Sequence, residues 1–162
     1  MNVQYINPFL SATISLFERS FGVTPEVGEI YLDDKAASHR WDISAVMVLT
    51  GSAIGVVAVR LTKLVADKLL EKSGVLWKDE TERAELVNGM VGELVNIIAS
   101  QAASQLTTEN IKVSVPLVIQ GKNHTISWPD KNPILAVPFI TSMGPFLVNV
   151  SLIELPKAYQ AH

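Results

Sequence analysis

The sequence predicts a single α+β domain, in which long helices pack on a mainly antiparallel sheet. Two observations support this fold class. Helical stretches with one apolar face occur together with short runs of β-branched residues, and glycine and proline punctuate these runs. The order of these elements also repeats once along the chain. We therefore expect one domain over residues 1–162, built from a duplicated helix–strand–hairpin unit at about 4–75 and 84–154.

The repeat rests on residues at matching positions. Asn7 and Asn96 lie in predicted helices at an offset of 89 residues, and a serine follows each asparagine by four positions. Thr50 and Thr141 lie in predicted hairpins at an offset of 91 residues. Two offsets this close indicate duplication of one unit.

The first unit begins with a helix. Asn7 followed by Pro8 predicts an N-cap with proline in the first helical position, and Gly22 predicts the end of that helix. Residues 27–32 then have the composition of a strand.

The next elements are a hairpin and a second helix. Residues 44–49 and 56–61 are rich in β-branched side chains and flank the turn-like stretch TGSAIG, which predicts two paired strands. Residues 61–72 form an amphipathic pattern, with Gly74 just past its end.

The second unit opens with the longest predicted helix, from Glu80 to about Leu106. Asp79 and Glu82 have the spacing of a capping box at its start. Four strand-like stretches follow the helix: IKVSVPLVIQG, HTISW, PILAVPFIT and PFLVNVSLIE.

Composition excludes several classes of function. The 162 residues carry a net charge of -3 without any basic block, which argues against binding to nucleic acid or to an anionic membrane. Cysteine is absent, so disulfides, thiolate metal sites and cysteine nucleophiles are excluded. The N-terminus does not resemble a signal peptide, and no apolar run approaches the roughly 20 residues of a membrane helix. We expect a cytoplasmic protein. Its 48% hydrophobic content suggests an extensive sheet or an oligomer interface.

The long helix contains residues that weaken helices. Asn88, Gly89, Gly92 and Asn96 lie in its interior, and together they forgo on the order of 3 kcal/mol relative to alanine. A solvated face without a function would carry alanine, lysine or glutamate at lower cost. These four residues therefore suggest a functional face.

That face carries two polar groups of interest. Glu93 and Asn96 lie about 60° apart around the helix axis, opposite the apolar stripe. The small residues Gly89, Gly92 and Ser100 surround them. The sequence therefore predicts a low surface with one carboxylate and one carboxamide, which another molecule could approach closely.

These residues resemble a known family. GELVNIIA followed by PLVIQG is similar to the CheC/CheX/FliY family of chemotaxis phosphatases, and most similar to its CheX members. The motif of that family is a glutamate, two residues, an asparagine and a later proline, which here are Glu93, Asn96 and Pro116. The stretches INPFLSATISLFERSFGV and LTGSAIGVVAVRLT extend the resemblance over residues 3–154.

The resemblance implies a substrate and a role for each site residue. The substrate would be the aspartyl phosphate of a phosphorylated CheY-like response regulator, which brings its own Mg²⁺ and lysine. Asn96 would position the attacking water, and Glu93 would pair with the lysine of the regulator. Gly89, Gly92 and Ser100 would form the docking face. The resemblance also implies a homodimer, and no cofactor or metal is expected on this chain.

Departures from the family pattern leave alternatives open. Gly89 stands where the family often has aspartate or serine, so the chain could be a non-catalytic CheC-like module that docks a regulator or another signalling partner. A dimerisation domain with an incidental polar face is a further alternative. In the first unit Gln4 stands where Glu93 stands in the second, so we expect one site per chain.

Other catalytic residues are not indicated. The histidines His39, His124 and His162 are scattered along the chain, and Ser11, Ser100 and Ser104 have no histidine near them in sequence. The stretch GSAIG joins two strands, whereas a phosphate-binding loop would open a helix.

Overall fold

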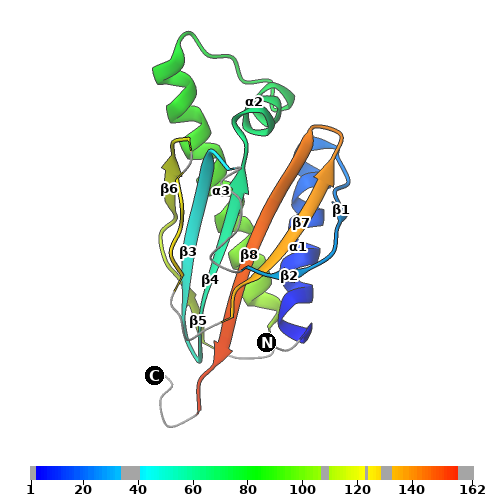
Figure 1. Ribbon diagram of the computed structural model, residues 1–162, viewed down its shortest axis with the longest axis vertical. Helices are drawn as coiled ribbons and strands as arrows, with labels where there is room; N and C mark the ends of the chain where they lie inside the picture. Colours follow the sequence, from blue (N-terminus) through cyan, green and yellow to red (C-terminus); the bar gives the residue numbers. More distant parts are fainter. Residues whose placement is uncertain (1–2, 34–40, 107–109, 123, 129–132, 157–162) are drawn as a thin grey trace.

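In the computed structural model, helices cover one face of an eight-stranded antiparallel sheet (Figure 1). The structure describes residues 3–33, 41–106, 110–122, 124–128 and 133–156. Within these ranges the elements are, in chain order, α1 (Val3–Phe21), β1 (Glu26–Val27), β2 (Tyr31–Leu32), β3 (Ile43–Gly51), β4 (Ala53–Leu61), α2 (Lys63–Lys72), α3 (Glu80–Gln105), β5 (Ile111–Val113), β6 (Leu117–Gln120), β7 (Leu135–Thr141) and β8 (Gly144–Glu154). The predicted α+β class is confirmed.

Two hairpins form the centre of the sheet. β3 pairs with β4, β7 pairs with β8, and the long pairing of β4 with β8 joins the two hairpins. The strand order is β1-β7-β8-β4-β3-β5, while β2 also pairs with β7 and β6 also pairs with β3. Both predicted hairpins are therefore present, because strand-like runs around turn glycines specify them locally.

The core lies between the sheet and the helices. Alternate residues of each central strand point toward α1 and α3, as period-two geometry requires. Phe17 of α1 stacks on Phe146 of β8 with ring centroids 4.5 Å apart, and Phe146 stacks on Phe139 of β7 at 4.9 Å. These rings fix α1 over the β7–β8 hairpin.

The helix α3 begins where the sequence predicts. The Asp79 carboxylate accepts a hydrogen bond from the Glu82 backbone N–H at 2.8 Å, and the helix then runs to Gln105. One side of α3 is buried against the sheet through Val87, Val91 and Ile98. The helix α2 starts at Lys63, two residues later than predicted, because Thr62 caps it.

The predicted start of α1 is wrong. Asn7 is not an N-cap, because the helix already includes Val3 and continues through Pro8. Proline lacks the N–H that would bond to the carbonyl four residues earlier. Packing offsets this loss, since Ile6 is buried in the core and the Tyr5 hydroxyl donates to the Glu154 carboxylate at 2.7 Å. Gly22, with φ of 64°, ends the helix as predicted.

Two predicted strands differ from the structure. Residues 27–32 form parts of two short strands, β1 and β2, because Pro138 of β7 has no N–H to continue the ladder and only accepts a bond from Gly28. Residues 124–128 form no strand. They lie on the sheet face away from the helices, where the His124 ring bonds to the Ser44 hydroxyl.

Within the described ranges, none of the helices combines the length and the apolar character that a membrane crossing would require.

Candidate functional site

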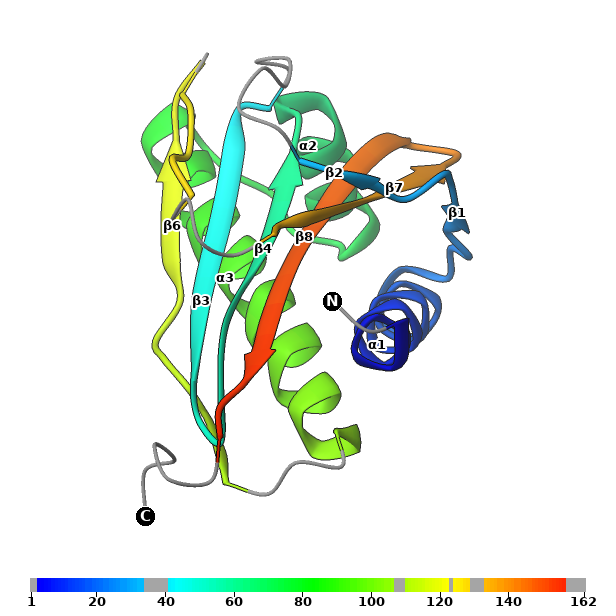
Figure 2. The same ribbon diagram turned by 60° about the horizontal axis from the view of Figure 1, so that its bottom comes forward.

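The predicted site lies on the side of α3 that faces away from the sheet. Glu93 is exposed, Asn96 is half-buried, and Ser100 is exposed one turn further on. The helix runs behind β3, β4 and β8, with α1 beside it (Figure 2). One continuous helix therefore presents the carboxylate and the carboxamide together on one open surface.

The two polar side chains differ in their surroundings. The Ser100 hydroxyl donates a hydrogen bond to Oδ1 of Asn96 at 3.3 Å. No hydrogen bond or ion pair engages the Glu93 carboxylate within the part of the chain that the structure describes. Gly89, one turn before Glu93, is exposed, and a Cβ placed on it would have no heavy atom within 4 Å. Glu93 and Gly89 therefore have no intramolecular role that accounts for them.

Gly92 does not belong to the open surface, which corrects the prediction that it forms part of a docking face. It is buried, and a Cβ placed on it would lie 3.4 Å from Cγ2 of Val118 and 3.7 Å from Cγ of Pro116. The neighbours of this glycine are therefore the chain's own Pro116 and Val118. Helical periodicity alone does not show that a later segment of the chain covers Gly92.

Asn88 also has an intramolecular role. The Gln120 side chain, at the end of β6, donates to the Ala84 carbonyl at 2.8 Å and to Oδ1 of Asn88 at 3.5 Å. These bonds and the contact at Gly92 tie β6 to α3. Of the four residues that weaken the helix, only Gly89 and Asn96 are left for the exposed site.

The motif proline comes close to the site through this packing. Pro116 precedes β6 and lies against Gly92, which is adjacent in sequence to Glu93. The structure therefore places Pro116 beside the turn of α3 that carries Glu93 and Asn96, although the proline lies far from them in sequence.

A groove continues the site toward the C-terminal end of α3. It has a volume of about 650 Å³ between the last turns of the helix and β5. Its lining is Ser100, Ala103, Ser104, Leu106, Asn110, Ile111 and Val113. Ser100 therefore forms the boundary between the Glu93–Asn96 surface and this groove.

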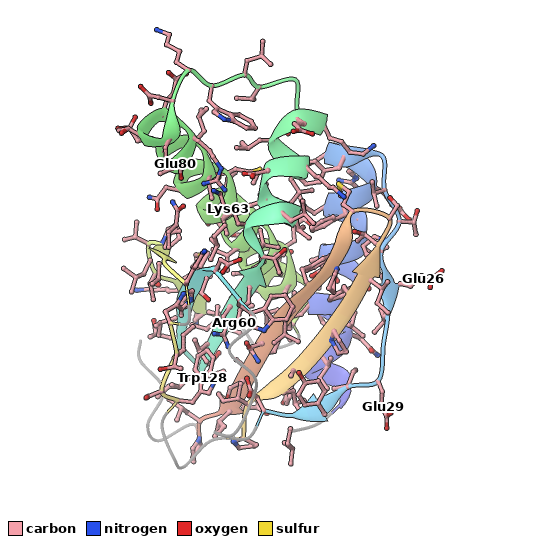
Figure 3. All side chains as sticks on the ribbon, turned by 45° about the horizontal axis from the view of Figure 1, so that its top comes forward. Glu26, Glu29, Arg60, Lys63, Glu80 and Trp128 are labelled. Carbon is pink, nitrogen blue, oxygen red and sulfur yellow. The ribbon has the colours of Figure 1, made fainter. Side chains whose placement is uncertain are left out.

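A second polar cluster lies on the opposite face of the sheet, and sequence reasoning missed it. Arg60 donates from Nε to the Ser44 hydroxyl at 3.1 Å, and that hydroxyl contacts Nε2 of His124 at 2.7 Å. Arg60 and Trp128 lie together on this face (Figure 3). Burial lowers the pKa of Arg60, and the nearby Asp33 carboxylate opposes that effect. The one sequence feature that could have indicated this cluster is Arg60 itself, a single arginine in the otherwise apolar strand β4.

This second cluster does not form a serine–histidine catalytic pair. The Ser44 side chain is 0% exposed, so no substrate reaches its hydroxyl. His124 also bonds through Nδ1 to the Gly121 carbonyl, which fixes the ring in a structural role. The other two histidines considered, His39 and His162, lie outside the described residues.

A buried arginine at the start of α3 was also missed. Arg83 is 5% exposed and forms ion pairs with Asp67 of α2 and with Glu80. Glu80 and Lys63 lie near one another at this end of the molecule (Figure 3). The Arg83–Asp67 pair connects α2 to α3, and the pair with Glu80 lies within α3. No group of three or more histidine, aspartate or glutamate side chains suited to a metal ion occurs among the described residues.

Comparison with known proteins identifies relatives. Residues 43–140, more than half of the chain, match the family model described as chemotaxis phosphatase CheX. No curated protein matches the chain.

Solved structures agree with this match. The chemotaxis protein CheX from Desulfovibrio desulfuricans is 31% identical with a TM-score of 0.81, covering 92% of this chain and 99% of its own. CheX in the CheX–CheY–BeF3–Mg²⁺ complex from Borrelia burgdorferi is 26% identical with a TM-score of 0.77, covering 93% and 98%. A CheC-like superfamily protein from Shewanella sp. PV-4 shares the fold, at 24% identity and a TM-score of 0.82, covering 94% and 99%.

Proposed function

The chain belongs to the CheX family of chemotaxis phosphatases, and from this premise we propose that it hydrolyses the aspartyl phosphate of a CheY-like response regulator. The observation that carries the proposal is the position of Glu93 and Asn96 next to each other on the exposed side of α3. Glu93 has no partner in the described chain, and Asn96 is a costly helix residue whose only described partner is Ser100.

The chemistry suits a carboxamide. In the reaction, water attacks phosphorus, the bond between phosphorus and the aspartate oxygen breaks, and inorganic phosphate is released. An acyl phosphate is already activated, so the catalyst chiefly has to hold water in line with the breaking bond. A carboxamide both donates and accepts hydrogen bonds without acting as a nucleophile itself. We assign this role to Asn96.

Glu93 has a different task in the proposal. Its carboxylate is exposed and unpaired, so it can form an ion pair with a lysine of the regulator when the two proteins meet. Gly89 and Ser100 border the surface and leave room for the partner backbone. The regulator would supply Mg²⁺, and we assign no cofactor to this chain.

The partner assignment has support from a relative. The Borrelia burgdorferi structure contains CheX together with CheY, BeF3 and Mg²⁺. Beryllofluoride is a mimic of a phosphoryl group on a carboxylate. A phosphorylated CheY-like regulator is therefore the partner that we propose for this chain.

We also propose that the chain forms a homodimer. Within the described residues, β5 and β6 each pair only with β3 and leave their other side unpaired. Val115 and Leu117 on this edge are 86% and 63% exposed. An open edge with large apolar side chains is usually covered in a stable protein.

A phosphate-release assay tests the enzymatic proposal. Response regulators from the same genome are phosphorylated with a small phosphodonor, freed of excess donor, and followed with and without the protein. Acceleration that depends on Asn96 supports a phosphatase. If the protein binds the BeF3-treated regulator but never accelerates phosphate loss, the alternative of a non-catalytic docking module holds.

A further inference from the structure

We infer that Ser100 is a positioning residue that orients the carboxamide of Asn96 for the attacking water. The inference rests on the proposed function, and it deepens the description of the same site. Its basis is the hydrogen bond from the Ser100 hydroxyl to Oδ1 of Asn96, at 3.3 Å across one helical turn.

This bond differs from those of three other hydroxyl groups in a helix or at the end of one. Serine and threonine in helices commonly bond to a backbone carbonyl three or four residues earlier. Thr13 donates to the Phe9 carbonyl at 2.7 Å, and Ser73 and Ser104 donate to the carbonyls of Leu69 and Gln101. Ser100 instead donates to a side chain, and that side chain is the proposed catalytic group.

The bond selects one of two orientations of the carboxamide. The terminal torsion of asparagine is broad and roughly two-fold, so an unrestrained carboxamide exchanges the places of its oxygen and nitrogen at little cost. Ser100 lies one turn toward the C-terminal end of α3, so its hydrogen bond holds Oδ1 of Asn96 on that side and leaves the NH₂ group outside this bond.

The orientation leaves the groups needed for catalysis free. An amide oxygen has two lone pairs, and Ser100 occupies only one of them. The second can accept a hydrogen from the attacking water, while the NH₂ group can donate to a phosphoryl oxygen. A docked regulator would exclude solvent from this surface, and a hydrogen bond is stronger where water is excluded.

The kinetic test compares matched variants in the dephosphorylation assay over a range of regulator concentrations. Ser100→Ala should lower kcat about fivefold with KM unchanged, which is the effect of losing one hydrogen bond of ordinary net strength. Ser100→Thr keeps the hydroxyl group, so its kcat should equal that of the wild-type protein. Ser104→Ala removes a hydroxyl one turn further on and should have no effect.

A double variant shows whether Ser100 acts through Asn96. Once Asn96→Ala has removed the carboxamide, adding Ser100→Ala should slow hydrolysis no further. If the two effects multiply, Ser100 acts independently of Asn96 and the inference is wrong. An unchanged kcat in Ser100→Ala overturns it as well.

A measurement that does not use activity separates this inference from the proposed function. In ¹⁵N NMR spectra, Ser100→Ala should shift the side-chain NH₂ signals of Asn96 and lower their order parameter, whereas Ser104→Ala should change neither. If these signals are the same in Ser100→Ala and wild type, Ser100 does not hold the carboxamide. If they change but the wild-type protein hydrolyses no regulator, the proposed function fails while the bond is real.

Discussion

Gly92 and Pro116 lie against each other, so that a methyl carbon on Gly92 would stand 3.7 Å from Cγ of the proline ring. This contact joins the two parts of the motif, the helix α3 and the segment before β6. It also buries Gly92 without any outside partner, because the segment leading into β6 packs on the helix at this point.

Gly92→Ala tests whether Gly92 belongs to this internal contact and not to the docking face. The added methyl group would make ordinary van der Waals contacts, 3.4 Å from Val118 and 3.7 Å from Pro116. Because alanine is the better helix former, the free energy of unfolding should rise by up to about 1 kcal/mol, as measured by urea denaturation. Hydrolysis should stay unchanged. A loss of regulator binding without a change in stability would return Gly92 to the docking face.

Gly89 provides the test of the docking surface. A side chain at this position meets no heavy atom of the chain within 4 Å, so Gly89→Ala and Gly89→Trp should both fold. Gly89→Ala should raise stability by about 1 kcal/mol. Gly89→Trp should weaken binding of a BeF3-treated regulator at least about tenfold, because an indole then stands where the partner backbone would approach. Equal affinity for the two variants in calorimetric titrations would place the docking surface elsewhere.

Local patterns predicted the central part of this fold. The β3–β4 and β7–β8 hairpins follow from strand-like runs and turn glycines, and Asp79 specified the start of α3 through a cap that the structure contains. Long-range contacts determine what was missed. The start of α1 depends on packing against β8, and the contacts of residues 124–128 depend on Ser44, far away in the chain. The duplication of the unit stays a prediction.

In the candidate site, too, the sequence predicted what depends on local pattern and missed what depends on long-range contacts. Helical periodicity placed Glu93 and Asn96 together, since both lie on one helix and need no knowledge of the fold. The neighbours of Gly92 come from a later segment of the chain, and no local pattern encodes them. Arg60 and Arg83 were missed for the same reason, because their partners come from other elements.

The bond between Tyr5 and Glu154 predicts a dependence of stability on pH. The hydrogen bond to the Glu154 carboxylate raises the pKa of Tyr5 above its ordinary value of 10.0, with smaller contributions from burial and from the carboxylate charge. The folded state therefore holds the tyrosine proton more tightly than the unfolded state does. This contribution is fully present below pH 10 and is lost as pH rises through the folded pKa.

Tyr5→Phe should accordingly lower the free energy of unfolding by about 1 kcal/mol or less at neutral pH, because the bond is partly exposed to solvent. The stability curves of the variant and the wild type should converge above pH 10. Glu154→Gln is the matched control, and it should bring the Tyr5 pKa, followed by ¹³C NMR of the ring, back toward its ordinary value. A stability difference that persists unchanged at high pH would contradict this account.

The open edge of the sheet predicts the state of assembly. Light scattering should return twice the 17.7 kDa mass of one chain at micromolar concentration. Replacing Val115 and Leu117 by lysine should give a monomer with unchanged secondary structure, because both side chains are largely exposed in the single chain and charges disfavour edge pairing. A wild-type monomer, or a dimer that survives both substitutions, would show that this edge is not the interface.

Asn96→Ala and Glu93→Ala should change the kinetics of hydrolysis in different ways, because Asn96 acts on the water and Glu93 acts on docking of the regulator. Loss of the carboxamide removes an interaction made chiefly in the transition state, so kcat should fall by roughly two to three orders of magnitude with little change in KM. Loss of the carboxylate leaves a lysine of the regulator unpaired across the interface, so KM should rise about tenfold or more and kcat should also fall.

Matched variants sharpen this comparison. Glu93→Gln keeps the shape of the side chain and removes only its charge, so it should reproduce the rise in KM, and high salt should narrow its difference from wild type. Glu85→Gln removes an exposed charge two turns earlier on the same helix and should have a much smaller effect. Circular dichroism should show equal helix content throughout, since neither alanine nor glutamine weakens a helix. If Asn96→Ala hydrolyses the regulator at the wild-type rate, Asn96 does not position the water, and the phosphatase mechanism proposed for this surface is wrong.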